Sequence, residues 1–392
     1  MSAAVDDFSN ATHPMACLRE EHEMLRDQVA RFVAEEVKPH GEAWEEKGHV
    51  PRDVLRKMGA LGFFGIRYPA QYGGSEMDTI ATAVFAEELG KSTFGGFAIT
   101  VLVHTDMASV HVFNASNETQ REKYMPGIIS GDTIVAVAVT EPGAGSDVKS
   151  MRSKATETQG GYLLNGSKMF ITNGVLADLY CVAAKTEGAD KPSRAVTMFL
   201  VEKGAEGLSV ARELDKQGWR SSDTAELVFE DCFVPHENIL GEAGGGFYAI
   251  MRNFQNERIV LAAQAMGEAQ AAIDLTLDYV KTRQAFGGPL FQREAIRQRL
   301  SMLAAKVEAA RALVYHTAWL DTQGIDCVKE VSMLKALCGE LVNEVMYDCV
   351  QFHGGTGYMR ETPINRMAND ARVQAIGGGA TEVMLEEVAK RL

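Results

Sequence analysis

Residues 140–147 read TEPGAGSD, and they directly follow a short β-rich run. Gly143 and Gly145 would let the backbone approach a ligand closely, because glycine has no side chain. Successive backbone N–H groups in such a turn can hold an anion, and the hydroxyls of Thr140 and Ser146 add donors at the same place. A surface turn between two strands would have the same composition, so this stretch alone leaves both interpretations open.

The turn belongs to a series of short β-rich runs that Gly, Asp and Asn residues separate. The runs cover residues 133–140, 162–164, 179–183, 196–201 and 226–234. Evenly spaced short strands of this kind are typical of a small antiparallel sandwich or barrel. We therefore expect a middle β domain at residues 133–243.

Helical patterns lie on both sides of the β region. Before it, four apolar residues recur at the spacing of one helix face: Leu25, Val29, Phe32 and Val33. After it, helical stretches cover residues 247–286, 291–322, 329–352 and 381–390. Long helices joined by short loops indicate a bundle. We expect a mainly α chain of the α+β class, with an N-terminal helical domain at 1–132 and a C-terminal helical bundle at 244–392.

The bulk composition excludes some classes of partner. The 392 residues carry a formal net charge of −14, which argues against nucleic-acid and anionic-membrane partners, because both need basic patches. The six cysteines form no C-x-x-C pair and the histidines add no metal-ligand spacing, so we expect no metal. We also expect no signal peptide around Asp6 and Asp7, no apolar stretch near the roughly 18 residues of a membrane span, and a cytoplasmic location.

Two weaker signals lie within the β region. Phe170 and Thr172 are two residues apart, so on a regular strand they would share one face and could meet a flat heterocycle. Arg220, in the stretch 219–224, could hold a phosphate by paired hydrogen bonds. A core phenylalanine and an exposed arginine in a turn are the alternatives, and each is favoured when its residue is taken alone.

Glu257 and Arg258 lie inside a long apolar helical stretch. A carboxylate that faces an apolar pocket has a raised pKa, which brings it into the range of a general base. A solvated Glu-Arg pair on the outer face of the helix is the alternative. Two glycine-rich breaks, 283–290 and 351–358, follow further along the chain, and either can be a plain helix stop.

Taken together and in this order, these segments resemble the acyl-CoA dehydrogenase family, from residue 18 to residue 392. The TEPGAGSD stretch and the stretch QFHGGTGY at 351–358 are highly specific in combination. The resemblance implies an N-terminal helical domain, a middle β domain and a C-terminal four-helix bundle. It also implies a homotetramer, built as a dimer of dimers, with one FAD in each subunit.

The resemblance assigns cofactor and substrate contacts residue by residue. It implies a flavin-contacting turn at Val139, Thr140, Gly145 and Ser146. Phe170 would pack on the isoalloxazine, and the Thr172 hydroxyl would bond near flavin N5. Contacts to the FAD of a neighbouring subunit would come from Arg283, Phe286, Gln351, Gly354 and Gly355. Ser146 and Arg258 would contact the CoA portion of the substrate.

The catalytic base is assigned from two observations: a glutamate is missing near the C-terminus, and a Glu-Arg pair is present on a helix. Medium- and short-chain members carry the base in a C-terminal E-G-T motif, and Gly378 stands in the place of that glutamate here. The isovaleryl-CoA and long-chain groups carry the base on a helix in a Glu-Arg pair, which Glu257-Arg258 matches. The resemblance therefore implies that Glu257 is the base and that the Gly378 N–H binds the thioester oxygen.

The implied reaction is the α,β-dehydrogenation of an acyl-CoA thioester to a trans-2-enoyl-CoA. Glu257 would remove the α-proton, the β-hydrogen would leave as hydride to the flavin, and electrons would pass to an electron-transferring flavoprotein. The chain departs from the usual family residues at Gly377, Glu294 and Ala380. The acyl group, and the choice between fatty-acid β-oxidation and amino-acid degradation, stay open. An oxidase on the same fold and a non-catalytic binding protein are the alternative functions.

Overall fold

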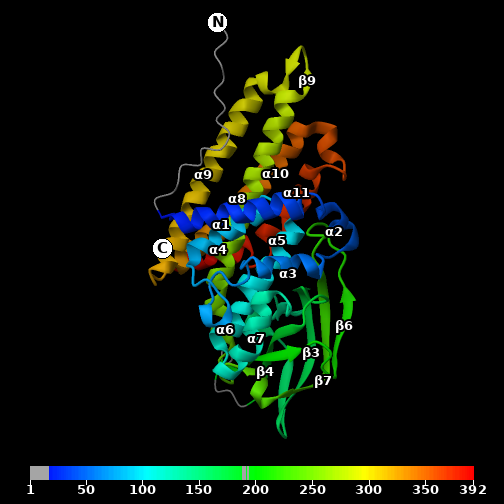
Figure 1. Cartoon of the computed structure of the whole chain (residues 1–392), viewed down its shortest axis with the longest axis vertical. Coiled ribbons are helices and arrows are strands. Elements are labelled where there is room, and N and C mark those ends of the chain that lie inside the picture. The colour runs from blue at the N-terminus through cyan, green and yellow to red at the C-terminus, as the bar shows by residue number, and fades with distance from the viewer. Residues whose placement is uncertain (1–16, 188–190, 192–193) are drawn as a thin grey trace.

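The computed structural model describes residues 17–187, 191 and 194–392, and the expectation on Asp6 and Asp7 lies outside this range. Helices come first in the chain, a sheet follows, and a second set of helices ends it, as Figure 1 shows. The expected α+β class, mainly α, is confirmed. The first helices are α1 (Glu20–Phe32), the π-helical turn η1 (Val33–Val37), α2 (Gly41–Lys47), α3 (Arg52–Ala60), α4 (Thr79–Gly90), α5 (Gly95–Leu102), the π-helical turn η3 (Val103–Ala108), α6 (Ser109–Ala115) and α7 (Glu118–Ser130).

The middle of the chain forms one mixed sheet. Its strands are β1 (Val135–Ala138), β2 (Lys154–Thr158), β3 (Gly161–Thr172), β4 (Leu179–Thr186), β5 (Val196–Glu202), β6 (Leu208–Glu213), β7 (Thr224–Pro235) and β8 (Ile239–Leu240). Their order is β6-β7-β3-β2-β4-β5-β8, with β1 beside β4. The expectation of a purely antiparallel sheet is wrong, because β1 and β2 both pair with β4 in parallel. A parallel pair needs a crossover connection, which the β2–β3 hairpin supplies between β1 and β4.

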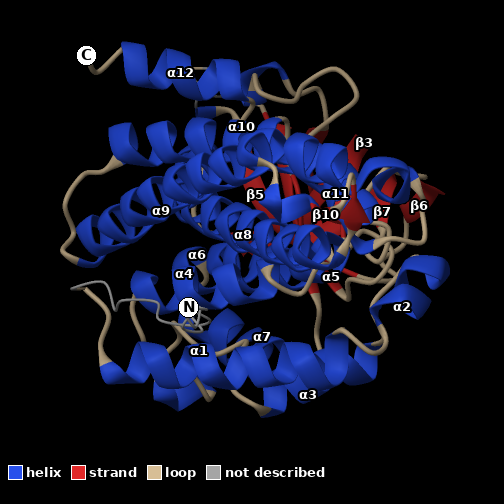
Figure 2. Ribbon diagram, turned by 90° about the horizontal axis from the view of Figure 1, so that it is seen from above, coloured by secondary structure: helices blue, strands red, loops and turns tan. Residues whose placement is uncertain are grey.

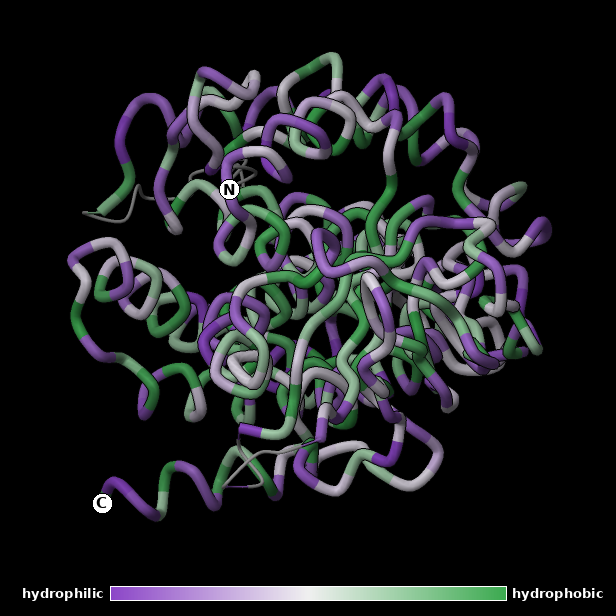
Figure 3. The backbone as a smooth tube through the Cα atoms, turned by 90° about the horizontal axis from the view of Figure 1, so that it is seen from below, coloured by the Kyte–Doolittle hydropathy of each residue, from purple (hydrophilic) through white to green (hydrophobic). Residues whose placement is uncertain are grey.

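The C-terminal helices are organised around α8 (Gly246–Thr282), which has 37 residues and is about 55 Å long at the usual helical rise. It is followed by the hairpin β9 (Gln284–Ala285) and β10 (Gly288–Pro289), then by α9 (Glu294–Thr322), α10 (Val328–His353), η8 (Gly354–Tyr358), α11 (Pro363–Ala371), η9 (Arg372–Ala375) and α12 (Thr381–Ala389). The expected helix at 247–286 ends four residues early, because Arg283 is extended and leads into the hairpin. Figure 2 shows α8 in the middle of the helices, and Figure 3 shows hydrophobic segments gathered around the centre of the molecule.

The segment Gly95–Ala115, which contains α5, η3 and α6, corrects one expectation. With 21 residues it is long and apolar enough to cross a membrane by length and composition, so the expectation that no such stretch exists is wrong. In the structure 94% of its apolar window is buried inside the protein. It packs against α4, α8 and β1, which is the position of a core helix.

Two glycines let α4 and α8 approach closely. A Cβ on Gly267 would lie 2.0 Å from the carbonyl oxygen of Glu87, and a Cβ on Gly90 would lie 2.3 Å from that of Gln264. Any larger residue would therefore push the two backbones apart. This contact places the polar residues of α8 deep inside the protein.

Glu268 is one of these buried residues and it has polar partners. Its carboxylate accepts hydrogen bonds from Gln264 Nε2 at 2.7 Å and from Gln374 Nε2 at 3.3 and 3.4 Å. Burial raises the pKa of Glu268 to about 7, because the charged form loses its hydration. In the unfolded chain the carboxyl would titrate near its ordinary value of about 4.3.

Glu268→Gln is expected to stabilise the protein most at high pH. The raised pKa means that the folded state keeps a proton that the unfolded state loses, so stability falls as pH rises from about 4.5 to 7 and stays reduced above pH 7. Glutamine never ionises. The free energy of unfolding of the variant, relative to that of wild type, should therefore increase by about 2 kcal/mol from pH 5 to pH 8. Urea unfolding at both pH values measures the gain, and an equal gain at the two values would contradict the prediction.

Candidate active site

A buried ion pair between Glu141 and Lys168 joins the TEPGAGSD turn to β3. The Glu141 carboxylate accepts hydrogen bonds from Lys168 Nζ at 2.7 Å, from the Arg152 backbone N–H at 2.5 Å and from the Ser153 backbone N–H at 3.0 Å. The side chains of Glu141 and Lys168 are 5% and 0% exposed. Burial alone would raise the pKa of Glu141, but Lys168 and these N–H groups hold that pKa below its ordinary value. The turn is therefore held rigidly against β3.

Phe170 stands out from β3 in a strained conformation. Its φ is +61°, which bulky residues rarely adopt, and its side chain is 68% exposed. The pairing of β3 with β7 shifts between Lys168 and Ile171, so the strand bulges there. The bulge breaks the simple alternation by which we expected Phe170 and Thr172 to share one face. A large exposed ring beside the turn is suited to stacking on a planar ligand.

Thr140 and Thr172 end up close to the same place. Met169 donates its backbone N–H to the Thr140 carbonyl at 2.9 Å, which joins the turn to β3 three residues before Thr172. Both threonines are half-buried. In the part of the chain that the structure describes, neither hydroxyl makes a hydrogen bond. The two hydroxyls are therefore available to a polar ligand.

Further polar atoms near α5 lie buried without a hydrogen-bond partner among the described residues. They are Thr100 Oγ1, Asn173 Oδ1, Trp219 Nε1 and Ser221 Oγ. Asn173 Nδ2 donates to the Thr100 carbonyl at 2.9 Å, and Cβ atoms on Gly95 and Gly96 would touch Trp219 and Ser221. Buried polar groups normally have partners, so this concentration fits a polar cofactor at the β-domain side of α5. Sequence reasoning assigned no role to these atoms, because the segments that carry them are far apart in the chain.

Glu257 is buried on α8. It is 6% exposed, and its Oε1 accepts a hydrogen bond from Asn253 Nδ2 at 2.9 Å. Burial raises the pKa of Glu257 to about 7, while Asn253 and Arg258 act in the opposite direction. The expected raised pKa is confirmed, and the alternative of a solvated pair on the outer face is wrong. A carboxylate with this pKa is suited to proton transfer near neutral pH.

Arg258 offers a positive charge that no described carboxylate neutralises within 4 Å. Its Nε is buried without a hydrogen-bond partner, and its guanidinium lies 5.3 Å from the centre of the Phe254 ring. Burial lowers its pKa below the ordinary value. A Cβ on Gly379 would lie 3.4 Å from Arg258 Nε, so Arg258 reaches the turn before α12.

Gly378 is packed against the helix that carries Glu257. A Cβ on Gly378 would lie 2.3 Å from Leu261 Cδ1, and Leu261 is one helical turn beyond Glu257. Gly378 and Gly379 have φ values of +65° and +111°, which other residues rarely adopt. In the described part of the chain the Gly378 N–H donates no hydrogen bond. The structure thus packs Gly378 against α8 one helical turn from Glu257.

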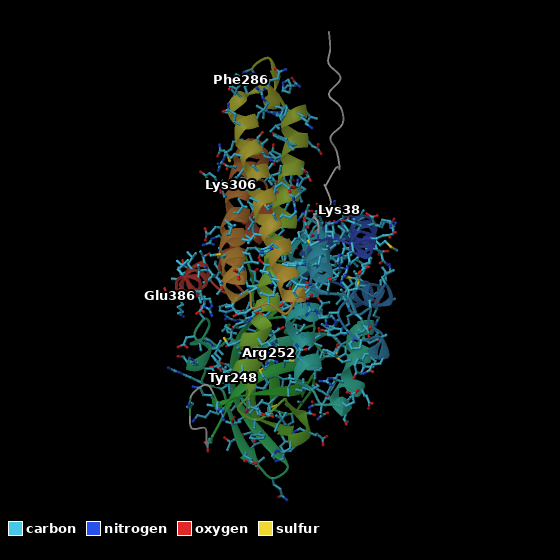
Figure 4. The ribbon with its side chains drawn as sticks, turned by 90° about the vertical axis from the view of Figure 1, so that its left-hand side faces the viewer. Lys38, Tyr248, Arg252, Phe286, Lys306 and Glu386 are labelled. Carbon is cyan, nitrogen blue, oxygen red and sulfur yellow. The ribbon has the colours of Figure 1, made fainter. Side chains whose placement is uncertain are left out.

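The remaining predicted contacts form a second cluster at the far end of the bundle. The ring of Tyr279 on α8 stacks on His353 at 4.4 Å, which joins the segment with Arg283 and Phe286 to the segment of Gln351, Gly354 and Gly355. Arg283 comes 26 residues after Glu257, or about 39 Å along a helix. Figure 4 shows Phe286 far from Tyr248 and Arg252, which lie near the start of α8. Within one subunit the two clusters therefore cannot contact the same ligand atoms.

Comparisons with known proteins identify the family. Family models described as the N-terminal, middle and C-terminal domains of acyl-CoA dehydrogenase match residues 19–132, 136–232 and 244–392. The chain is 38% identical to an acyl-CoA dehydrogenase of Bacillus subtilis, over 95% of this chain and 98% of the relative. It is 40% identical to the mitochondrial long-chain specific acyl-CoA dehydrogenase of Mus musculus, over 95% and 86% of the two chains. It is 36% identical to the mitochondrial isovaleryl-CoA dehydrogenase of Solanum tuberosum, over 94% and 89%.

Solved structures give the same result. The acyl-CoA dehydrogenase from Geobacillus kaustophilus matches with a TM-score of 0.93 and 37% identity, over 96% of this chain and 99% of that one. A structure described as an electron transferring flavoprotein of Acidaminococcus fermentans matches with a TM-score of 0.93 and 35% identity, over 96% and 99%. The FAD complex of PigA matches with a TM-score of 0.91 and 28% identity, over 95% and 98%.

Lys168→Met is expected to destabilise the protein by about 3 kcal/mol, because it leaves the Glu141 carboxylate buried without its cation. The double variant Glu141→Gln/Lys168→Met should recover most of this loss, since no buried charge remains. Urea unfolding of both single variants and the double variant measures the coupling. Lys154→Met, which removes an exposed lysine of β2, serves as the control and should change stability by less than about 0.5 kcal/mol. Additive losses in the double variant would contradict the prediction.

Proposed function

Because this chain belongs to the acyl-CoA dehydrogenase family, an oxidoreductase family, we propose that it converts an acyl-CoA thioester to a trans-2-enoyl-CoA with FAD as cofactor. The observation that carries the proposal is a buried carboxyl, Glu257, on the helix against which Gly378 packs through Leu261, with the Gly378 N–H free of hydrogen bonds among the described residues. A base and an oxyanion donor side by side are what removal of a proton next to a thioester carbonyl requires.

Glu257 is the proposed catalytic base. Its raised pKa makes it a stronger base than an ordinary carboxylate, and its apolar surroundings keep water from competing for it. Asn253 donates a hydrogen bond to Oε1, and the described residues donate none to Oε2, which leaves that oxygen available to accept the proton. The Gly378 N–H stabilises the enolate oxygen as the α-proton leaves, because the charge develops on that atom.

The cofactor turn fits a flavin. Val139, Thr140, Gly145 and Ser146 would line it, the Phe170 ring would cover one face, and the Thr172 hydroxyl would bond a ring nitrogen. The support is the exposed, strained Phe170 and the unpartnered hydroxyls of Thr140 and Thr172. When bound, FAD accepts the β-hydrogen of the substrate as a hydride.

Two residues would hold the CoA portion, which is anionic. Arg258 provides a half-buried charge without an ion pair among the described residues, and Ser146 provides an exposed hydroxyl on the turn. Gly377 leaves room for the acyl group, since a Cβ there would make only ordinary contacts with Val373 at 3.6 Å. We propose an acyl pocket of the isovaleryl-CoA and long-chain type, with the base on the helix, and the choice between those chains belongs to the test below.

We propose a homotetramer in which the distal cluster completes the FAD site of a neighbouring subunit. Phe286 supports this, because its ring is 92% exposed at the end of the bundle and has φ +51°. The contacts would come from Arg283, Phe286, Gln351, Gly354 and Gly355. We keep the division at residues 1–132, 133–243 and 244–392 as part of the same proposal.

The proposed electron acceptor is an electron-transferring flavoprotein, and the proposed location is the cytoplasm. The six cysteines are unpaired, which suits a reducing compartment. Hydrogen peroxide formed at the rate of turnover in air would instead identify an oxidase.

Glu257→Gln is expected to slow flavin reduction by acyl-CoA on the order of 10³-fold, because the amide cannot accept the α-proton. The measurement is an anaerobic titration with straight- and branched-chain acyl-CoAs, followed by the visible flavin absorbance. Glu268→Gln is the matched control, since it removes a second buried carboxyl of similar pKa from the same helix and should leave the rate unchanged. Full reduction of Glu257→Gln at the wild-type rate would move the base elsewhere, and a wild-type flavin that stays oxidised with every thioester would overturn the function.

The rate constant of flavin reduction should rise with pH and level off above about 7. A general base works deprotonated, so activity increases as pH passes upward through the pKa of Glu257. Asn253→Ala removes a hydrogen bond that lowers this pKa, so the midpoint should move to higher pH. Stopped-flow reduction across pH 5 to 9 tests both statements, and a midpoint that Asn253→Ala leaves in place would contradict the assignment.

A further inference from the structure

Lys335 of α10 is a buried cation without an ion pair. Its side chain is among the largest that are fully buried, at 2% exposure, and no described carboxylate lies within 4 Å of its Nζ. It donates instead to two backbone carbonyls, that of Gln374 at 2.5 Å and that of Gly379 at 3.3 Å. Burying an ammonium group is costly, and here burial lowers its pKa to about 8. Because burying the Lys335 ammonium group costs free energy, we expect this side chain to have a function that offsets the cost.

The two carbonyls that Lys335 holds lie on either side of Gly378. The Lys335 Cε also lies 3.7 Å from the position of a Cβ on Gly378. Consecutive glycines with positive φ have no side chains to limit their conformation, and glycine loses more freedom on ordering than any other residue. The segment 374–379 therefore depends on bonds from outside it, and Lys335 supplies two of them, to its first and last residues.

Charged residues of three helices, α8, α10 and α12, lie around this turn. Arg258 of α8 reaches Gly379 from one side and helps to lower the pKa of Lys335 on the other. Glu387 of α12 favours the charge of Arg258, and Glu340 of α10 favours that of Lys335, but neither carboxylate lies within 4 Å of its cation. Arg258 and Lys335 repel each other. A negative charge that develops between them would attract both and offset this repulsion. Such an arrangement stabilises a transition state more than a ground state.

We propose that Lys335 is a positioning residue for the dehydrogenation: it holds the segment 374–379 in the conformation that leaves the Gly378 N–H free for the thioester oxygen, and its charge favours the enolate. The inference rests on the proposed function and adds a residue to it. Lys335 does not touch the substrate, so it acts through the turn and through its electric field.

The experiment compares Lys335→Met with wild type as FAD-loaded protein. Methionine keeps the length of the side chain but removes the charge and both hydrogen bonds. The rate constant of flavin reduction should fall about 10- to 100-fold, as for other supporting residues of catalytic groups, with less than about threefold change in the Kd of acyl-CoA. Acetoacetyl-CoA is the second probe, because it ionises to an enolate without being oxidised, and its pKa when bound should rise by about one unit or more in the variant.

The controls separate this inference from the proposed function. Lys329→Met removes a lysine from the same helix, six residues earlier and away from the turn, and should match wild type in both measurements. If wild type is reduced and Lys335→Met is reduced equally fast with an unchanged enolate pKa, the positioning role is wrong and the function stands. If wild type is not reduced by any acyl-CoA, the function fails first. Lys335→Gln is the second variant, and loss of FAD binding or of the fold in both variants would assign Lys335 to folding and overturn the proposal.

Discussion

The contact of α4 with α8 is the constraint on which the site depends. At Gly267 the two helices are so close that a single methyl group would lie 2.0 Å from a carbonyl oxygen. This distance places α8 among the other helices, where more than half of its residues are buried. Glu257 and Glu268 are therefore buried and Arg258 is half-buried by the position of their helix, and their altered pKa values follow from that position.

Burial alone does not make a catalytic base, as a comparison of two residues of α8 shows. Glu257 and Glu268 are eleven residues apart, or about three turns, and burial raises both pKa values to about 7. Glu268 is bound by Gln264 and Gln374, so its oxygens are occupied. Glu257 has one such partner, Asn253, and lies one turn from the residue that packs on Gly378. The neighbouring groups, and not the pKa, distinguish the proposed base from a structural acid.

The sequence predicted the features that residues close together in the chain determine. Short stretches of sequence were enough to predict the C-terminal helices and the turn at 140–147. They were also enough to show that Gly378 replaces one possible catalytic glutamate and that Glu257 offers another. Features made by distant segments were missed or wrong. The parallel pairing with β4 and the bulge at Phe170 depend on how strands meet, and the burial of Gly95–Ala115 depends on what surrounds it. Lys335 gave no signal, because a lysine in a helix normally lies on the surface and only the fold shows that this one does not.

Local charge also explains how an acidic protein could bind an anionic substrate. The net charge of −14 is spread over the surface, where water and salt screen it within about 10 Å. Lys335 is buried and Arg258 is half-buried, so water and salt screen them less, and no described carboxylate pairs with either cation. Two cations without a described ion-pair partner therefore lie beside the Gly378 turn, although the whole chain is negative. A thioester that becomes an enolate at this turn would place its negative charge near both cations, which would offset part of the cost of burying Lys335.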